Sequence, residues 1–388
     1  MLIDPRDWPS PACGTKEERL QAHRRLWVVA VAAIALLALG ACSKKAGTGG
    51  SGGSAPAGSG PPGAAGIDYQ ALSGTVNGSG ATFPKTFYES AIGGMRAKAP
   101  NLTNNYAGGG SGKGKQDLAD QVVDWAGSDS TVKPDDLGKY KGGTILYFPT
   151  VAAPITVSYN LADVGSLKLS PSTLARIFQG EIKAWNAPEI QADNQGTNLP
   201  GTPVVVAHRS DGSGTTSNFT RYLKAAAAAD WKLDAGDTVS WPADSQAGSG
   251  NSGVAQIVKS TKGAIGYVDF ADAKASGLQL AAIKNRSGNF VAASLQGASA
   301  ALAGATVKPD LTYDPLDAPG DNAYPITAPT WVIVYERQAD ATRGNAVKAW
   351  INYVLSDGQV LAPTVDFAPL PEGIQRQAVA QLDKIRIG

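Results

Sequence analysis

From Ile67 to the C-terminus, short apolar runs alternate with stretches in which apolar residues recur at helical spacing. Strands that alternate with helices are typical of α/β proteins, in which helices pack on the faces of a sheet. The runs expected to form strands are residues 124–128, 145–159, 204–207, 264–270 and 330–335. The stretches expected to form helices are residues 84–99, 213–228, 341–355 and 372–386. The chain is therefore predicted to fold as an α/β protein.

One of the expected strands contains two prolines. Pro149 and Pro154 lie within residues 145–159, and proline has no N–H group to donate to a neighbouring strand. We therefore expect the two prolines to interrupt any continuous central strand in this segment.

The composition of the 388 residues excludes several classes of function. A net charge of +1 gives no basic surplus, so a nucleic-acid partner held by bulk electrostatics is not expected. Two cysteines and two histidines are too few for a zinc site, a disulfide scaffold or a Cys/His nucleophile. We therefore expect neither a metal nor another cofactor.

The N-terminal segment has the features of an export signal. Residues 26–39 form a 14-residue apolar run without a charge, and His23, Arg24 and Arg25 precede it. As a helix this run would rise about 21 Å, short of the roughly 30 Å hydrocarbon core of a bilayer. A basic flank, a short apolar core and small residues after it are typical of a secretory signal, with a transmembrane anchor as the alternative. Residues 1–41 are therefore predicted to be a signal peptide with an N-terminal extension.

The apolar run ends in Leu39-Gly40-Ala41-Cys42, which resembles a bacterial lipobox. In lipoproteins the cysteine at this position is acylated, and several acyl chains hold the protein at a membrane. An unmodified, buried cysteine is the alternative. Residues 47–66, mostly glycine, serine, proline and alanine, have too few apolar side chains to offset the entropy of ordering them. We therefore predict a lipidated Cys42 and a tether that together span residues 42–69.

Three turns rich in glycine and hydroxyl side chains each stand directly before a helical stretch. They are residues 78–84 (GSGATFP), 108–114 (GGGSGKG) and 208–216 (HRSDGSGTT). A helix N-terminus exposes unpaired N–H groups and the positive end of the helix dipole, and glycine lets an anion approach the backbone. One such turn is usually only a helix cap, whereas three of them, together with an arginine and an aspartate in similar loops, favour an anion-binding site.

Two catalytic motifs are matched only in part. Residues 109–116 fit the G-x-x-x-x-G-K pattern of a P-loop, but Gln116 stands where magnesium binding needs Ser or Thr. No convincing strand is expected before this loop either. A serine hydrolase would need His208 as its base, but no G-x-S-x-G sequence frames a serine, and His208 is expected at a strand end. Neither motif is therefore the favoured interpretation.

Several segments together resemble one known family. They are residues 81–84 (ATFP), 108–116 (GGGSGKGKQ), 125–129 (WAGSD), 174–186 (LARIFQGEIKAWN), 209–215 (RSDGSGT) and 263–268 (GAIGYV). In these segments the chain is similar to the phosphate-binding protein (PstS) family of the bacterial ABC phosphate-uptake system. The resemblance runs from about Leu72 to the C-terminus, in the order that the family has.

The resemblance implies a two-lobed periplasmic binding protein of type II (Venus-flytrap), with a hinge that the chain crosses twice. Lobe I would comprise residues 70–150 and 331–388, and lobe II residues 151–330. The two crossings would fall near residues 149–159 and 324–335. An anion would bind in the cleft, and the lobes would close around it by a hinge motion.

The resemblance also implies which residues bind phosphate. They are Ala81, Thr82, Phe83, Ser111, Asp129, Arg209, Ser213, Gly214 and Thr215. Most of them would offer backbone N–H groups or hydroxyls at helix starts. Arg209 would place its planar guanidinium against two phosphate oxygens, and Asp211 is expected to orient Arg209 rather than to contact the ligand.

Asp129 is the unusual member of this set, because a carboxylate can face an anion only if the anion carries a proton. Phosphate at neutral pH carries at least one P–OH group and sulfate carries none. Asp129 would therefore accept a hydrogen bond from phosphate and repel sulfate. The alternative for Asp129 is a structural aspartate at a turn or helix cap.

The sequence thus predicts a binding protein, not an enzyme, that captures inorganic phosphate and delivers it to the membrane subunits of an ABC permease. We expect a monomer in the periplasm or cell envelope, held at the membrane by its lipid anchor. Arsenate, which is also protonated, and sulfate are the alternative ligands. A secreted phosphohydrolase that holds product phosphate in the same cleft is the alternative from another class.

Overall fold

The computed structural model describes residues 66–388. The signal peptide, Cys42 and the tether up to residue 65 lie outside the described residues. Strands and helices alternate, which confirms the α/β prediction. The first elements are η1 (Tyr69–Ala71), β1 (Gly74–Gly80), α2 (Lys85–Lys98), β2 (Leu102–Gly108), α3 (Ser111–Ala119), β3 (Trp125–Ser128) and η2 (Pro134–Lys139), where η marks a 3-10 helix.

The middle of the chain contains many short elements. They are β4 (Ile145–Tyr159), β5 (Lys168–Leu169), α4 (Pro171–Phe178), α5 (Pro188–Asp193), β6 (Val205–Arg209), α6 (Gly214–Ala226), β7 (Gln246–Gly248), α7 (Gly250–Ser260), β8 (Ala264–Asp269), α8 (Phe270–Ala275), β9 (Gln279–Leu280), β10 (Ala282–Lys284), β11 (Phe290–Val291) and α9 (Leu295–Ala303). The last elements are β12 (Thr327–Tyr335), β13 (Arg337–Gln338), α10 (Ala341–Leu355), η3 (Asp357–Val365), α11 (Glu372–Gln381), η4 (Leu382–Lys384) and β14 (Arg386–Ile387).

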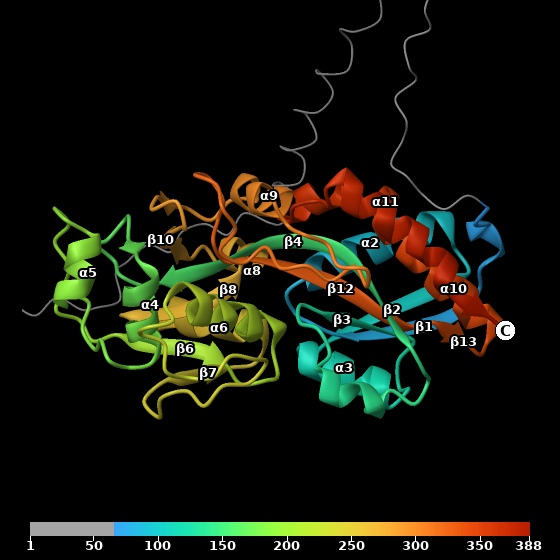
Figure 1. Cartoon of the computed structure of the whole chain (residues 1–388), viewed down its shortest axis with the longest axis horizontal. Coiled ribbons are helices and arrows are strands. Elements are labelled where there is room, and N and C mark those ends of the chain that lie inside the picture. Colours follow the sequence, from blue (N-terminus) through green and yellow to red (C-terminus); the bar gives the residue numbers. More distant parts are fainter. Residues whose placement is uncertain (1–65) are drawn as a thin grey trace, which may run out of the picture. The chain divides into compact units, whose positions relative to one another are not determined.

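The main sheet has the strand order β2-β1-β3-β12-β4-β8-β6-β7, and β9 adds to β4. Two sets of parallel strands lie at its ends: β1, β2 and β3, which we call the first strand group, and β6, β7 and β8, the second strand group. The antiparallel strands β12 and β4 join them, as Figure 1 shows. The chain therefore passes between the two strand groups along β4 and β12.

The prediction that prolines interrupt residues 145–159 is wrong, because β4 is one continuous strand of 15 residues. Pro149 pairs with Trp331 beside a shift of register that leaves Thr150 as an extra residue, as in a β-bulge. Pro154 pairs with Thr327, the first residue of β12, and the pairing of β4 with β8 begins one residue later. Both prolines thus stand where the ladder is irregular or changes its partner, so their missing N–H groups are tolerated.

Each strand group has its own aromatic core. In the first, the buried rings of Tyr88 and Trp125 lie 5.4 Å apart at their centroids, and Trp350 of α10 lies 5.3 Å from Trp125. In the second, Phe219 of α6 lies 4.6 Å from Tyr267 of β8. Such large buried rings dominate the energetics of a core and hold α6 and α10 against the sheet.

Most predicted helices are found close to their expected bounds, and the helix expected over residues 341–355 is confirmed as α10. The helix expected over residues 372–386 ends earlier, at Gln381, and continues as η4 and β14. Among residues 66–388, no helix combines the length and apolar character needed to cross a bilayer.

Candidate anion-binding site

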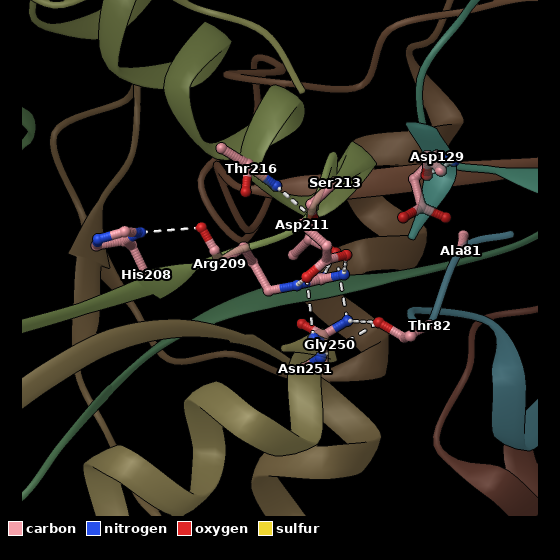
Figure 2. Close-up of polar contacts among 12 residues, drawn as sticks. Ala81, Thr82, Asp129, His208, Arg209, Asp211, Ser213, Thr216, Gly250 and Asn251 are labelled. Atoms are coloured by element: carbon pink, nitrogen blue, oxygen red, sulfur yellow. Dashed lines mark hydrogen bonds and ion pairs between the residues drawn. The ribbon is translucent and has the colours of Figure 1, made fainter. Parts of the chain in front are cut away.

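The carboxyl ends of both strand groups converge on one cluster of polar side chains (Figure 2). Strands β1, β2, β3, β6 and β7 end at Gly80, Gly108, Ser128, Arg209 and Gly248, and a turn follows each of them. Ligands of open α/β sheets characteristically bind at the carboxyl ends of parallel strands. The three glycine-rich turns found in the sequence all lie here, and they lead into α2, α3 and α6.

Hydrogen bonds join the turns of the two strand groups. Asn251 of α7 donates from its backbone N to Thr82 Oγ1 at 3.2 Å. Asn218 of α6 donates from Nδ2 to the carbonyl oxygen of Asp129 at 2.6 Å. The N–H of Gly112 donates to the carbonyl oxygen of Gly212 at 2.8 Å. Residues separated by more than 80 positions in the sequence therefore meet at this cluster.

Glycine is required at two of these contacts. A Cβ atom on Gly110, whose φ is +91°, would lie 2.2 Å from Asp211 Oδ2. A Cβ atom on Gly214 would lie 2.5 Å from Ser111 Oγ. Neither distance leaves room for a side chain, so the turns of the two strand groups approach each other more closely than any other residue would allow.

Four hydroxyl groups in the cluster accept hydrogen bonds from N–H donors. Ser111 Oγ accepts from the backbone N of Asp129 at 3.1 Å, and Ser213 Oγ accepts from that of Thr216 at 3.1 Å. The remaining two, Thr82 Oγ1 and Thr215 Oγ1, accept from Asn251 Nδ2 at 3.1 and 3.3 Å. A hydroxyl that accepts from a protein N–H keeps its own proton for another acceptor. None of these four hydrogen bonds therefore uses a hydroxyl proton.

The guanidinium of Arg209 is buried within the cluster, with its side chain 1% exposed. Asp211 accepts two hydrogen bonds from it, one of them from Nε to Oδ1 at 2.9 Å and the other from Nη2 to Oδ2. Burial alone would raise the pKa of Asp211, but the hydrogen bonds and positive charge of Arg209 outweigh it, so the pKa is lowered. The expectation that Asp211 orients Arg209 agrees with this geometry.

Asp129 is 2% exposed and directly follows β3. Its Oδ1 accepts a hydrogen bond from Thr330 Oγ1 of β12 at 2.8 Å. Burial raises the pKa of Asp129 to about 7, although the hydrogen bond from Thr330 and the charge of Arg209 oppose the rise. The carboxyl group is therefore able to change its protonation state near neutral pH.

Ala81 differs from the expectation for a residue that offers its N–H to an anion. Its N–H donates to the carbonyl oxygen of Gly127 at 2.9 Å, as the last hydrogen bond of the parallel pairing that ends at Gly80 and Gly127. Its carbonyl oxygen accepts from Tyr106 Oη at 2.7 Å. Ala81 therefore helps to frame the turn that carries Thr82 and Phe83, and its own N–H is occupied.

His208 lies at the carboxyl end of β6, as expected, and points away from the cluster (Figure 2). Its ring stacks on Trp241 with a centroid distance of 5.2 Å, and burial lowers its pKa. Its Nδ1 lies 2.9 Å from the carbonyl oxygen of Arg209. This placement gives no support to a role for His208 as the base of a serine hydrolase.

The expectation that no strand precedes the P-loop-like residues 109–116 is wrong, because β2 ends at Gly108. Gln116 nevertheless differs from the Ser or Thr that a P-loop has at this position. Its Nε2 donates to Asp120 Oδ2 at 2.8 Å on the exposed side of α3. A hydroxyl for magnesium is therefore still missing at this position, and the loop serves instead as one of the turns of the cluster.

Three residues of the cluster were not identified as candidates from the sequence: Asn251, Thr330 and Asp237. Asn251 lies within a fourth segment of this kind, residues 248–253 (GSGNSG), which has the same glycine and hydroxyl composition as the other three and could have been found by that pattern. Thr330 and Asp237 carry no local signal, since their partners Asp129 and Lys115 are remote in the sequence.

Comparisons with known proteins identify the family of the chain. Residues 62–358 match the model of the PBP superfamily domain. Phosphate-binding protein PstS of Pasteurella multocida is 36% identical over 313 residues, which cover 79% of this chain and 89% of that protein. Phosphate-binding protein PstS of Methanocaldococcus jannaschii is 35% identical over 338 residues, covering 80% of this chain and 86% of that protein.

A solved structure shows the same fold. It is a high-affinity periplasmic phosphate-binding protein (PfluDING) bound with phosphate, and it aligns with a TM-score of 0.67 over 79% of this chain and 94% of that chain, at 24% identity. The fold and the converging strand ends define a periplasmic binding protein with the two-lobed, type II architecture. Within that superfamily the chain belongs to the phosphate-binding protein PstS family.

Proposed function

We propose that this chain binds inorganic phosphate in the cleft between its two lobes and delivers it to an ABC phosphate importer. The observation that carries the proposal is that four hydroxyl oxygens of the cluster accept hydrogen bonds from N–H groups of the protein. Thr82, Ser111, Ser213 and Thr215 all accept from N–H donors, so four hydroxyl protons remain for an anion beside a buried arginine. The names of the PstS relatives support phosphate as that anion.

Arg209 supplies the positive charge of the proposed site. Asp211 occupies one edge of its guanidinium, through Nε and one N–H of Nη2. Nη1 donates one N–H to Thr215 Oγ1 at 3.4 Å. The other N–H of Nη1 and the second N–H of Nη2 then remain for two phosphate oxygens, as a bidentate, charge-assisted pair. The first N–H groups of α6, at Gly214 and Thr215, have no partner within the helix. They lie at its N-terminus, where the positive end of the helix dipole favours an anion. The N–H groups of Thr82 and Phe83, just before α2, are proposed as further donors to phosphate. The N–H of Ala81 is not, because it already donates to Gly127.

Asp129 is proposed to select the ligand. In its ionised form it can accept a hydrogen bond only from an oxyanion that still has a proton, which phosphate and arsenate have and sulfate lacks. A site that requires a buried hydrogen bond can reject an analogue without it by roughly 10⁴–10⁵. Phosphate is therefore favoured over sulfate, and arsenate is the remaining alternative ligand.

Lobe I is proposed to comprise residues 70–150 and 331–388, and lobe II residues 151–330. The hinge is proposed to lie where β4 and β12 pair.

Family membership supports a periplasmic location, and a lipid anchor at Cys42 is proposed to hold the monomer at the membrane. We further propose that the protein has no enzymatic activity, since the site offers donors for an anion and its histidine points elsewhere.

Titration of the chain with phosphate, sulfate and arsenate in a calorimeter tests this proposal. We expect one phosphate per chain and a far weaker response to sulfate. A parallel assay with a phosphomonoester separates the alternative of a phosphohydrolase, because a binding protein gives no turnover. Absence of phosphate binding, or steady release of phosphate from the ester, would overturn the proposal.

A further inference from the structure

Asn251, the second residue of α7, has no exposed surface and contacts three other segments. Its Nδ2 donates to Thr82 Oγ1 at 3.1 Å, and its backbone N donates to the same oxygen at 3.2 Å (Figure 2). Its Nδ2 also donates to Thr215 Oγ1 at 3.3 Å. One side chain therefore touches a hydroxyl from each strand group.

The orientation of the Asn251 amide is fixed by a third contact. Its Oδ1 accepts a hydrogen bond from the backbone N–H of Asp269 at 3.2 Å. A backbone N–H can only donate, so the oxygen of the amide must face Asp269 and the NH₂ group must face the two hydroxyls. The two hydroxyls consequently meet donors and cannot give their own protons to Asn251.

The number of hydrogen bonds that each hydroxyl oxygen accepts then limits where the hydroxyl protons of Thr82 and Thr215 can point. Thr82 Oγ1 accepts two N–H groups of Asn251, and Thr215 Oγ1 accepts from Asn251 and from Arg209 Nη1 at 3.4 Å. A hydroxyl oxygen has two lone pairs and one proton, so both oxygens have their acceptor positions filled. Within the described residues, neither hydroxyl donates to another protein atom in this arrangement, which leaves both protons for a ligand.

We infer that Asn251 is a positioning residue for the anion site, which turns the hydroxyl protons of Thr82 and Thr215 toward the ligand. The inference rests on the proposed phosphate site and adds to it a residue that acts through the two threonines rather than on phosphate itself. An asparagine is suited to this task because its amide holds one acceptor and two donors at fixed angles. Serine or aspartate at this position would let the threonine hydroxyls donate to the protein instead.

A double-mutant cycle on phosphate affinity tests the inference in the full chain. Asn251→Ala is expected to weaken phosphate binding about tenfold, because two hydrogen bonds to a charged ligand lose their alignment. In a chain that already carries Thr82→Val and Thr215→Val, the same substitution is expected to change the affinity less than about twofold. Asn105→Ala, on the exposed side of β2, is the matched control and should leave the affinity unchanged.

Asn251→Asp provides a second cycle that keeps the shape of the side chain. Its negative charge repels phosphate equally with and without the threonine hydroxyls, so that repulsion cancels and only the effect on the hydroxyls remains. Equal fold-losses in the two backgrounds, for both substitutions, would overturn the inference and show Asn251 to be structural. A parent chain that binds no phosphate would instead overturn the proposed function, and the inference with it.

Discussion

Lys115 of α3 forms an ion pair with Asp237, with Nζ and Oδ2 2.7 Å apart. The two side chains are 14% and 20% exposed and line a cavity of about 310 Å³ beside the polar cluster. Lys115 also donates to Ser130 Oγ at 2.8 Å, and the carbonyl oxygen of Asp237 accepts from the backbone N of Ser213 at 2.8 Å. The pair therefore ties α3 of the proposed lobe I to the start of α6 in the proposed lobe II.

Asp237→Asn is expected to weaken phosphate binding about three- to tenfold. Because the pair joins the two proposed lobes, it is expected to favour their closed state by roughly 1 kcal/mol. Most of the change should appear as faster dissociation of phosphate, which stopped-flow measurements can follow. Asp244→Asn removes an exposed partner of Lys183 and serves as the control. Identical dissociation rates for the two variants would show that the Lys115–Asp237 pair does not hold the cleft closed.

Arg209→Ala is expected to weaken phosphate binding by about 10²–10³-fold or more. Loss of one partner of a buried, charged pair costs roughly 3–5 kcal/mol, and an affinity changes tenfold for about 1.4 kcal/mol. Calorimetric titration measures the change. Arg221→Ala is the matched control, because Arg221 lies on α6 with its side chain 43% exposed and pairs with Asp314. A loss below about threefold for Arg209→Ala would place this arginine outside the binding site.

Sulfate binding is expected to depend on pH through Asp129. Burial raises the pKa of this carboxyl to about 7, and sulfate has no proton to offer, so sulfate can bind only when Asp129 is protonated. Below pH 7 the free protein already holds that proton, and sulfate affinity should be nearly constant. Above pH 7 each bound sulfate requires the uptake of one proton, so the affinity should fall about tenfold per pH unit. Competition titrations between about pH 6 and 9 measure this slope, and a constant or rising affinity above pH 7 would contradict the assignment.

Cys42→Ala is expected to abolish labelling of the chain by a radioactive fatty acid, because Cys42 is the proposed acylation site. A chain that begins at Ile67 should keep the full affinity for phosphate, since every residue of the proposed site lies after it. Metabolic labelling and calorimetry measure the two results. Persistent labelling of the Cys42→Ala variant would refute the anchor, and loss of binding in the shortened chain would refute the separation of anchor from site.

Local sequence patterns predict those parts of the site that depend on local structure. The serine that caps α6 is an example: Ser213 precedes a helical stretch, and in the structure its Oγ accepts from the N–H of Thr216. The turns at residues 78–84 and 108–114 are found for the same reason, because glycine and hydroxyl residues before a helix have a local physical role.

Contacts between remote segments are not predicted in this way. Thr330 donates to Asp129 across 201 positions in the sequence, and Lys115 meets Asp237 across 122. Neither Thr330 nor Asp237 has a local feature that sets it apart. The continuity of β4 could not be predicted locally either. Pro149 and Pro154 are tolerated because of a bulge and a change of pairing partner, and both depend on strands that are remote in the sequence.

Asp129→Asn distinguishes selection of a protonated oxyanion by Asp129 from a purely structural role of this residue. Asparagine keeps the shape of the side chain but removes the charge, so phosphate should lose only roughly 1–2 kcal/mol of binding free energy. Sulfate should gain affinity, because the repulsion is removed and an amide donor faces its oxygen.

Competition titrations of the parent and the Asp129→Asn variant with phosphate and sulfate, at one pH above 7, give the decisive measurement. We predict that the ratio of phosphate to sulfate affinity falls by more than the phosphate affinity itself. If both affinities change together and the ratio stays constant, Asp129 has a structural role and the selectivity arises elsewhere in the cleft.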